Sequence, residues 1–474
     1  MKTTAHDDLA RAMRAIVGDA FVRTDDASRR EYGTDALRRG APADVVVLPA
    51  NTDEVAAIAR YCHDTYTPLV PRGGGTGYTG GSVPVRGGVV ISLERMNRIL
   101  EIDQANMLAI VEPNVITGDL QDAVEAVGLF YPPDPASLRM SAIGGNVAEC
   151  AGGPRAFKYG VTRNYVMGTE AVLPTGEVIK TGGKSVKNVV GYDLTQLLVG
   201  SEGTLAILTK ITLRLVPQPP TSSTLRATFP GIRHAVDAVM RLVQARVVPA
   251  TLELIDRDSL DAVAEAIGAR LAPPETEALL LLEVDGLAEQ VAAEAERVEA
   301  ACVAAGALEV LRARTDEERE ELWRVRREIS LSLKTIASLK FNHDIVVPKA
   351  RVPELFELVA SLRARFGIRI PAFGHVGDGN IHVNMMVSRD DPDAIQRAKA
   401  AEGELFRGVI ALEGSISGEH GIGFSKAPYL GLELEPEVIA LMQRVKQAFD
   451  PHGILNPGKI FPNEVAASDI PPVV

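Results

Sequence analysis

Residues 71–82 of the chain read Pro-Arg-Gly-Gly-Gly-Thr-Gly-Tyr-Thr-Gly-Gly-Ser, with six glycines in twelve positions. Glycine adopts positive φ without a steric penalty, so this backbone is able to turn repeatedly and to approach a ligand closely. Successive N–H groups in such turns form a concave anion site, and a diphosphate is a common guest. We interpret the stretch as a phosphate-binding loop; the alternative is a glycine-rich hairpin without a ligand.

The residues around this loop argue against a Rossmann turn. A formal Gly-x-Gly-x-x-Gly match runs from Gly75 to Gly80, but a dinucleotide-binding helix would then have to begin there. Pro84 and two further glycines follow instead, and after them comes the strand-like sequence Val-Val-Ile-Ser at 89–92. The pattern over 45–93 therefore predicts strand, helix, strand, loop and strand, with the glycine-rich loop between two strands.

Composition limits the class of protein. The chain has 474 residues, too many for one ordinary core, which predicts two or three domains. Its formal charge of −12, from 50 basic and 62 acidic residues, argues against general binding to nucleic acid or to anionic membranes. Three scattered cysteines fit a reducing compartment. Because no apolar run is long enough to span a bilayer and no apolar signal core is evident, we expect a cytoplasmic location.

Two more glycine-rich segments follow the first, at 142–153 and at 200–204. Three segments of close-approaching backbone in one domain predict an extended ligand, because a mononucleotide would not need them all. A proline-rich linker at 217–223 ends this part of the chain. Beyond it, predicted strands and helices alternate as in split β-α-β units.

Five of the eight histidines lie after residue 340. His375 and His382 flank a Gly-Asp-Gly-Asn turn at 377–380, which predicts a hairpin with the two histidines directly opposed. Opposed Cβ atoms lie about 4.5–5.5 Å apart, close enough for both imidazoles to bind one divalent ion. With Glu419 as third ligand, the set suits catalytic Zn²⁺, Mn²⁺ or Fe²⁺. The alternative is two hydrogen-bonded histidines in a polar pocket.

His420 follows Glu419 in a loop with glycines on both sides. A histidine that titrates near neutrality is suited to act as a general base, although a turn histidine is the simpler alternative. Arg326 lies in a long, charged helical segment. Its two-pronged guanidinium could clamp a substrate carboxylate, whereas an exposed surface arginine is the more common case.

On these motifs the chain resembles the vanillyl-alcohol oxidase/p-cresol methylhydroxylase superfamily of flavoproteins. Within it, the chain is similar to the family of D-lactate dehydrogenase, the glycolate oxidase D-subunit and D-2-hydroxyglutarate dehydrogenase. The resemblance is carried by nine segments: 71–82, 132–137, 143–153, 158–161, 191–194, 200–205, 374–382, 417–423 and 456–459. It implies an α+β fold with a two-part FAD-binding domain of the p-cresol methylhydroxylase type and an α+β cap domain with ferredoxin-like β-α-β units.

We place four segments along the chain on this basis. They are an N-terminal helical segment (1–40), the FAD-binding domain (41–218), the cap or substrate domain (219–450) and a C-terminal segment (451–474) that returns to the FAD-binding domain. The cap domain is expected to carry the substrate site.

The resemblance implies FAD as the cofactor, with its pyrophosphate on residues 71–82 and backbone contacts from 143–153 and 202–207. We expect non-covalent binding, because residues 64–149 contain neither the histidine nor the cysteine to which relatives attach the flavin. The residues expected to bind FAD are Pro71, Arg72, Gly73, Gly74, Gly75, Thr76, Gly77, Gly80, Gly81, Ser82, Pro133, Ser137, Gly144, Gly145, Asn146, Ala148, Glu149, Gly152, Gly153, Tyr159, Gly160, Val161, Glu202, Gly203, Ile207 and Asn456.

The resemblance also implies roles in the second half of the chain. The family's metal ligands match His375, His382 and Glu419, its catalytic base matches His420, and its substrate contacts match Arg326, Ser330 and Asn384. Asn342, which we also expect to contact the substrate, stands where hydroxyglutarate-type members have a lysine. This difference favours a monocarboxylate substrate, unless Lys340 replaces the missing cation.

These features predict FAD-dependent, metal-assisted oxidation of a small D-2-hydroxy acid, D-lactate or glycolate, with hydride transfer to flavin N5 and His420 as base. A quinone, a cytochrome or an electron-transferring flavoprotein would accept the electrons. The alternatives are a D-2-hydroxyglutarate dehydrogenase, an alkylglycerone-phosphate-synthase-like enzyme and a non-catalytic flavoprotein subunit. We expect a homodimer or a complex with other oxidase subunits, no nucleic-acid partner, and either a cytoplasmic location or peripheral attachment to the inner membrane.

Overall fold

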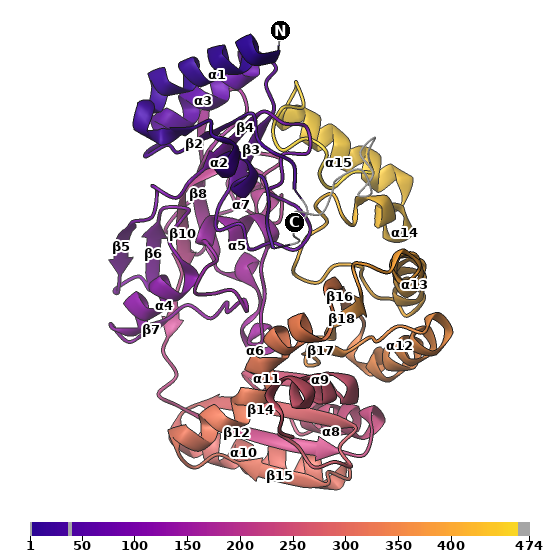
Figure 1. Cartoon of the computed structure of the whole chain (residues 1–474). Helices are drawn as coiled ribbons and strands as arrows, with labels where there is room; N and C mark the ends of the chain where they lie inside the picture. The colour runs from indigo at the N-terminus through magenta and orange to yellow at the C-terminus, as the bar shows by residue number, and fades with distance from the viewer. Residues whose placement is uncertain (1, 37–39, 463–474) are drawn as a thin grey trace. The chain divides into compact units, whose positions relative to one another are not determined.

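The computed structural model describes residues 2–36 and 40–462 (Figure 1). Within these residues the chain forms two compact units. The first unit combines 2–36, 40–152, 161–218 and 419–462, and the second combines 153–160 and 219–418. The end of the predicted C-terminal segment, 463–474, lies outside the described residues.

A four-stranded sheet carries the glycine-rich loop in the first unit. Its strands run in the order β1 (Val22–Arg23), β2 (Val45–Val47), β4 (Val89–Ser92) and β3 (Leu69–Arg72). The last three are parallel, and β1 is antiparallel to β2. Helices α1 (Lys2–Val17) and α3 (Thr52–Asp64) bury Met13 and Ile58 against one face of this sheet. Each such side chain contributes about 1.5–3 kcal/mol on full burial, so this core fixes the strands at both ends of the loop.

The observed order β2, α3, β3, loop and β4 confirms the order predicted from the sequence. The parallel neighbours β3 and β4 are joined by residues 73–88, which contain no helix. The glycine-rich loop is therefore not a Rossmann turn.

An antiparallel five-stranded sheet forms the other layer of the first unit. Its order is β5 (Ile99–Asp103), β6 (Leu108–Val111), β10 (Ile207–Arg214), β8 (Val166–Val172) and β9 (Val178–Gly182). A small ribbon pairs β7 (Leu129–Phe130) with β11 (Val216–Pro217). The other helices of this unit are α2 (Asp26–Glu31), α4 (Thr117–Glu125), α5 (Ile143–Glu149), α7 (Leu194–Leu198), α14 (Leu430–Glu433) and α15 (Pro436–Phe449).

Seven antiparallel strands form the sheet of the second unit. Their order is β15 (Glu309–Arg312), β12 (Thr221–Phe229), β14 (Ala278–Gly286), β13 (Thr251–Asp256), β17 (Ala372–His375), β18 (Asn380–Val387) and β16 (Leu339–Val346). Leu279 and Leu281 of β14 pack against α9 (Arg257–Ile267) and α11 (Asp316–Ile336). Leu280 and Leu282 point to the opposite face and are also fully buried. Helices α8 (Ile232–Gln244) and α10 (Ala288–Ala304) contact β12 and β14.

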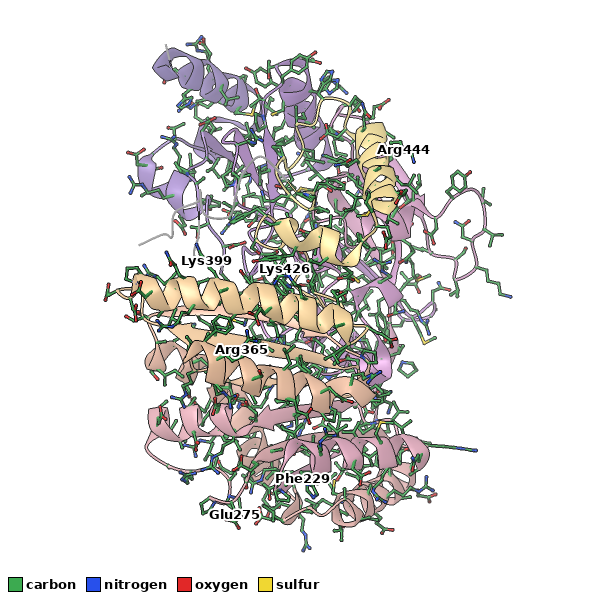
Figure 2. The ribbon with its side chains drawn as sticks, turned by 90° about the vertical axis from the view of Figure 1, so that its right-hand side faces the viewer. Phe229, Glu275, Arg365, Lys399, Lys426 and Arg444 are labelled. Carbon is green, nitrogen blue, oxygen red and sulfur yellow. The ribbon has the colours of Figure 1, made fainter. Side chains whose placement is uncertain are left out.

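Two long helices lie side by side, as Figure 2 shows, and the second of them also contacts β16 and β18. They are α12 (Val352–Phe366) and α13 (Pro392–Ala411). Arg365 of α12 donates to both carboxylate oxygens of Glu404 on α13, at 2.7 and 3.0 Å. The short helix α6 (Ala156–Tyr159) belongs to this unit although it precedes the linker by some sixty residues.

The chain returns to the first unit at Glu419, whereas the cap domain was predicted to end at residue 450. Hydrogen bonds explain this difference. The N–H groups of Ile422 and Gly423 donate to the two carboxylate oxygens of Glu202, both at 2.7 Å. A pairing over some 220 residues leaves no local signal in the sequence. None of the helices in the described part of the chain is both long and apolar enough to span a bilayer.

Candidate active site

The glycine-rich loop needs glycine for two separate reasons. Gly75 and Gly80 have φ of +65° and +81°, which side-chain-bearing residues rarely adopt. A Cβ on Gly80 would also lie 2.0 Å from Cε1 of Phe424. The loop therefore makes close contact with residues that follow it by more than 300 positions.

Arg72, which the resemblance assigns to FAD binding, lies at the end of β3 and is largely buried. Its Nη1 donates to the carbonyl oxygen of Thr34 at 2.5 Å, and to the carbonyl oxygen of Tyr32 and the hydroxyl of Ser82 at 3.4 Å. Burial lowers the pKa of Arg72. In this structure its guanidinium thus links the loop to residues 32–34 by hydrogen bonds.

The second glycine-rich run forms the short helix α5. The N–H of Gly144 donates to the carbonyl oxygen of Pro113 at 2.6 Å, and a Cβ there would lie 2.7 Å from the proline ring. A Cβ on Gly145 would have no neighbour within 4 Å, so the surface at this residue is open. The amide of Asn146 donates to Thr117 Oγ1 at 2.6 Å. Packing within the protein therefore explains why Gly144 has no side chain, but it does not explain Gly145.

Predicted cofactor residues from three segments meet beside the loop. The side-chain amide of Asn456 donates to the carbonyl oxygens of Gly81 and Glu202, both at 2.8 Å. Gly203 has φ of +64°, and a Cβ there would lie 2.6 Å from Cγ of Pro71. Residues far apart in the sequence are thus brought together as the resemblance implies.

The remaining predicted cofactor residues lie in the segments that connect these elements. Pro133 and Ser137 lie between β7 and α5, Ile207 begins β10, and the carbonyl oxygen of Ala148 accepts from the N–H of Glu202 at 2.8 Å. The hydroxyl of Tyr159 donates to Oδ2 of Asp285 at 2.7 Å, within the second unit. This contact anchors the 153–160 excursion, which was not predicted.

The loop that carries His420 is fastened directly to the glycine-rich loop. The hydroxyl of Thr79 donates to the carbonyl oxygen of His420 at 3.0 Å, and the Thr79 carbonyl accepts from the N–H groups of Phe424 and Ser425 at 3.1 and 3.2 Å. The rings of His420 and Tyr78 lie 5.3 Å apart. The backbone on both sides of His420 is therefore positioned by the predicted FAD loop.

Ionisable groups are buried beneath these two loops. Burial, followed by repulsion from Glu202 and Asp35, raises the pKa of Glu149 well above its ordinary value. Burial also raises the pKa of Glu202, against the opposing effect of the Ile422 and Gly423 N–H groups. Lys459, for which no role was predicted, lies in the same group. Burial lowers its pKa to about 7, and its Nζ donates to the carbonyl oxygen of Val83 at 2.6 Å.

His375, His382 and Glu419 form a cluster with metal-ligand geometry. One ligand atom from each lies within 4.8 Å of the others, and both histidines are buried. Two imidazoles and a carboxylate are a donor set that suits a divalent transition metal. The residues predicted as metal ligands from the sequence therefore lie together, although metal binding itself stays a prediction.

The expected direct opposition of the two histidines is wrong. His375 pairs with Asn380, and His382 pairs with Phe373, because the turn occupies residues 376–379. The histidines are diagonal neighbours on one face of the sheet, where long side chains still meet. Their ring centroids lie 5.4 Å apart and the rings are nearly perpendicular.

Residues 415–418 hold Glu419 beside this hairpin. Ser415 forms a bridge to Val346 at the end of β16, and the N–H of Gly418 donates to Oδ2 of Asp344 at 2.9 Å. The other oxygen of Asp344 accepts from the amide of Asn380 at 2.6 Å and lies 4.0 Å from Nδ1 of His382. Asp344 is fully buried and was not predicted from the sequence.

Glu253 is a second buried carboxylate that was not predicted. It lies opposite His375 in the pairing of β13 with β17 and has no solvent exposure. Nδ1 of His375 is hydrogen-bonded to its Oε1, and Nε of Arg326 donates to its Oε2. Burial alone would raise the pKa of Glu253, but its interactions with His375 and Arg326 hold it well below its ordinary value. A charged residue within the apolar strand Thr-Leu-Glu-Leu-Ile at 251–255 was the available signal.

The predicted substrate contacts fall into two groups. Arg326 lies on α11 with its guanidinium 4.9 Å from the centre of the Phe373 ring, and Ser330 follows it by one helical turn on an exposed position. Asn342 and Asn384 pair across β16 and β18, and the amide of Asn342 donates to Oδ1 of Asn384 at 3.0 Å. Asn384 is fully buried. Its amide donates to the carbonyl oxygen of His382 at 3.2 Å, which links it to the metal-ligand hairpin.

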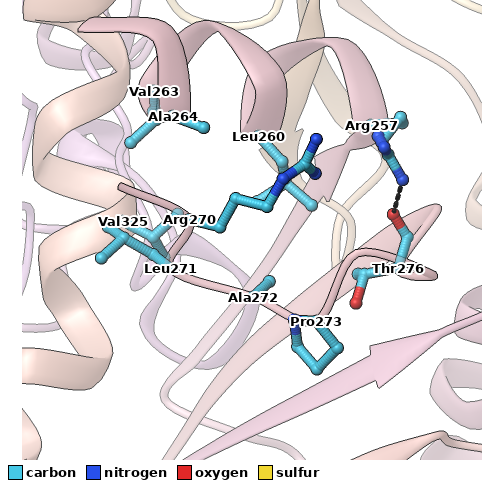
Figure 3. A pocket seen from close by; sticks show the side chains of 10 residues that line it. All are labelled: Arg257, Leu260, Val263, Ala264, Arg270, Leu271, Ala272, Pro273, Thr276 and Val325. Atoms are coloured by element: carbon cyan, nitrogen blue, oxygen red, sulfur yellow. Dashed lines mark hydrogen bonds between the residues drawn. The ribbon is translucent and has the colours of Figure 1, made fainter. Parts of the chain in front are cut away.

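A small pocket elsewhere in the second unit contains none of the predicted site residues (Figure 3). It is lined by residues of α9, by residues 270–273 and Thr276, and by Val325 of α11, and Arg257 donates to the carbonyl oxygen of Thr276 at 3.1 Å. Its walls are mainly apolar and hold no histidine or carboxylate. The pocket therefore offers no acid–base or metal chemistry.

Comparison with known proteins places these features in a family. Residues 43–182 match the FAD binding domain model, and residues 218–460 match the model described as FAD linked oxidases, C-terminal domain. The glycolate oxidase subunit GlcD of Bacillus subtilis (strain 168) is 42% identical, over 96% of this chain and 97% of that protein. The D-lactate dehydrogenase of Anaerostipes hadrus is 36% identical, over 94% of each chain.

A solved structure, that of p-cresol methylhydroxylase with substrate bound, superposes with a TM-score of 0.81. The sequences are 18% identical, and the match covers 96% of each chain. At this identity the likeness concerns the fold alone. It confirms the predicted α+β architecture of an FAD-binding domain with a cap domain, and the family matches confirm the resemblance and the FAD prediction.

Proposed function

We propose a reaction for this chain on one premise: the chain belongs to the family of FAD-linked oxidases. The reaction is oxidation of a small D-2-hydroxy acid, D-lactate or glycolate, to the 2-oxo acid. The observation that carries this proposal is the cluster of His375, His382 and Glu419, next in sequence to His420. Two relatives, named for glycolate oxidation and D-lactate dehydrogenation, support the substrate class.

Each group has a separate task in this reaction. His375, His382 and Glu419 would hold a divalent metal, and residues 71–82 with Gly145 and Asn456 would hold FAD. When bound, the metal supplies Lewis-acid polarisation of the substrate oxygens and FAD supplies the hydride acceptor. Arg326 binds the substrate carboxylate, which orients the Cα–H bond. His420 accepts the proton of the hydroxyl group as the Cα hydride leaves.

The experiment is anaerobic reduction of the FAD-loaded protein by D-lactate, by glycolate and by D-2-hydroxyglutarate, followed by flavin absorbance. We expect D-lactate or glycolate to bleach the flavin, and if none of the three does so at saturation, the substrate class is wrong. His420→Ala should keep FAD and slow bleaching by about 100-fold, the lower end of the usual contribution of base catalysis. His452→Ala is a matched control, because His452 is an exposed histidine stacked on His63 in the same unit.

D-2-hydroxyglutarate is the second candidate substrate. Asn342 replaces the lysine expected for a distal carboxylate, but Lys340 lies two residues earlier on the same strand and therefore on the same face. Lys340→Met separates the cases: it should raise the KM for D-2-hydroxyglutarate and leave that for glycolate unchanged. A quinone, a cytochrome or an electron-transferring flavoprotein would accept the electrons, and the subunit status of the Bacillus relative favours a multi-subunit complex.

A further inference from the structure

Glu253 sits between two residues to which the proposed function gives separate tasks. It belongs to the central strand β13, has no exposed surface, and is flanked in sequence by the buried residues Leu252 and Leu254. Its Oε1 is hydrogen-bonded to Nδ1 of His375 and its Oε2 accepts from Nε of Arg326. A buried charge is costly unless it is paired and hydrogen-bonded, and here each oxygen has a different partner.

The contact with His375 determines which of the two ring nitrogens carries the hydrogen. A carboxylate accepts hydrogen bonds only, so Nδ1 of His375 carries the hydrogen in this pair. The other ring nitrogen, Nε2, is then the one with a lone pair for a metal. Metal-binding histidines commonly donate their second N–H to a carboxylate in this manner, which fixes the tautomer and the ring orientation.

The contact with Arg326 is made through Nε rather than through the two terminal nitrogens. The guanidinium has five N–H donors in a planar fork. An ion pair at Nε fixes the plane of this fork and leaves its terminal edge outside the pair with Glu253. Arg326 is 12% exposed, so it reaches the boundary between the buried pair and the surface of the unit.

We infer that Glu253 is a positioning residue that sets the metal-binding tautomer of His375 and the orientation of the Arg326 clamp with a single carboxylate. This inference rests on the proposed function for the tasks of His375 and Arg326. It accounts for a charge in the middle of an apolar strand, where an apolar residue would pack at lower cost. It also explains why one hydrogen-bonded chain joins a predicted metal ligand to a predicted substrate contact.

Glu253→Gln is the informative change, because the amide keeps the shape but offers one acceptor and one donor. If the glutamine oxygen keeps Arg326, the glutamine NH₂ faces His375, whose Nδ1 must then accept and whose Nε2 becomes protonated. If the oxygen keeps His375, the NH₂ faces Nε of Arg326. We therefore expect Zn²⁺ affinity to fall by about 10- to 100-fold, measured by competition with a chelator, or the KM for the hydroxy acid to rise at unchanged kcat.

Glu283→Gln is the matched control. Glu283 lies on the neighbouring strand β14, is 6% exposed, and accepts from Nε of Arg319, which lies two helical turns before Arg326 on α11. Its variant removes the same kind of charge from the same sheet without touching His375. We expect its Zn²⁺ affinity and KM to stay within twofold of the wild-type values.

A second measurement does not depend on how well Glu253→Gln folds. In wild-type protein labelled with ¹⁵N-histidine and loaded with zinc, His375 should show a protonated Nδ1 and a metal-bound Nε2, with its signals assigned from a His375→Ala sample. Three results would each overturn the inference. They are a metal-bound Nδ1 in His375, wild-type protein in which zinc does not bind His375, and Glu253→Gln protein that keeps the wild-type zinc affinity and KM. Zinc binding requires no substrate, so an absence of flavin bleaching would refute the proposed reaction while this experiment still decides the role of Glu253.

Discussion

The two units carry their candidate functional residues on different kinds of structure. In the first unit, loops carry the relevant residues: the glycine-rich loop, the turn at 202–204 and the segment 419–425 are joined to one another by hydrogen bonds between side chains and backbone groups. In the second unit, adjacent strands carry them: Glu253, His375 and His382 project from β13, β17 and β18. Strand register fixes side-chain positions by itself, whereas loops need partners, so the first unit uses buried polar groups to hold its loops.

The buried carboxylates of the two units differ accordingly. Glu149 lies near Glu202 and Asp35, and burial with like-charge repulsion raises its pKa. Glu253 is equally buried, but its contacts with His375 and Arg326 keep its pKa low. Burial raises the pKa of both groups, so the neighbouring residues decide whether the net shift is upward or downward. A low pKa suits a carboxylate that must stay ionised to orient a ligand, and a raised pKa suits one that can remain protonated between loops.

Removing Arg326 should leave Glu253, like Glu149, buried without a cation hydrogen-bonded to it. The resulting loss in the free energy of unfolding is the largest effect we expect. Arg326→Met leaves the fully buried Glu253 with His375 alone, and breaking a buried ion pair by removing one partner typically costs about 3–5 kcal/mol. The measurement is urea unfolding of the metal-free protein at pH 8. Arg319→Met on the same helix is the control, because its side chain is 41% exposed. If the two variants lose the same free energy of unfolding, the buried ion pair stabilises the fold no more than the exposed one does.

The loop–loop contact of the first unit is tested by adding one methyl group. In Gly80→Ala the new Cβ would lie 2.0 Å from the Phe424 ring at a φ of +81°, so one of the two loops must move. Overpacking of this kind costs about 1–3 kcal/mol, and displacement of the loop should also reduce the FAD content of the purified protein. Gly183→Ala is the control, because no atom lies within 4 Å of its Cβ. Retention of full FAD content and stability in Gly80→Ala would show that the contact between the loops is not needed.

The contrast between loops and strands also explains what could be predicted from the sequence. The glycine-rich loop between β3 and β4, the linker and the turn between His375 and His382 were predicted from local patterns: glycine spacing, proline content and turn residues. Glu419 lies in another segment, and its role as third ligand was implied by the family resemblance. The pairing of His375 with His382 was placed two residues out of register. A turn sequence indicates that a hairpin closes, but the number of residues left unpaired depends on the strands on either side.

Residues that act through long-range contacts were missed. Glu253 meets His375 across 122 residues, and Glu202 meets Ile422 across 220. Lys459 enters the carboxylate cluster from the far end of the chain. No spacing rule connects such pairs, because their proximity depends on the order of strands in a sheet and on the return of the chain to the first unit. Only a charged residue inside an apolar strand, as at Glu253, gives a local hint.

The smallest effect we expect is a change in the pH dependence of stability. In the unfolded chain Glu149 loses its proton near pH 4.5, whereas in the folded protein it does so at a higher pH. Between these values the folded state binds more protons, so the free energy of unfolding falls as the pH rises. Glutamine cannot titrate, so Glu149→Gln should lose less stability than wild type as the pH rises from 4.5 to about 7.

Urea unfolding across this range, with wild type and variant in parallel, measures the difference. The groups that face Glu149 are Glu202, Asp35, Lys426 and Lys459. The lowered pKa of Lys459, about 7, acts in the opposite direction above that pH, and Glu149 itself raises that pKa, so the two proteins are compared below pH 7. Glu253→Gln is the counterpart in the second unit. A carboxylate with a lowered pKa is ionised above pH 6 in both the folded and the unfolded state. This variant should therefore be less stable, but its free energy of unfolding should change with pH as that of the wild type does. If Glu149→Gln follows the wild-type slope as well, the two buried carboxylates do not differ in the way proposed. Burial beside Arg326 and burial among carboxylates would then have the same consequence for folding.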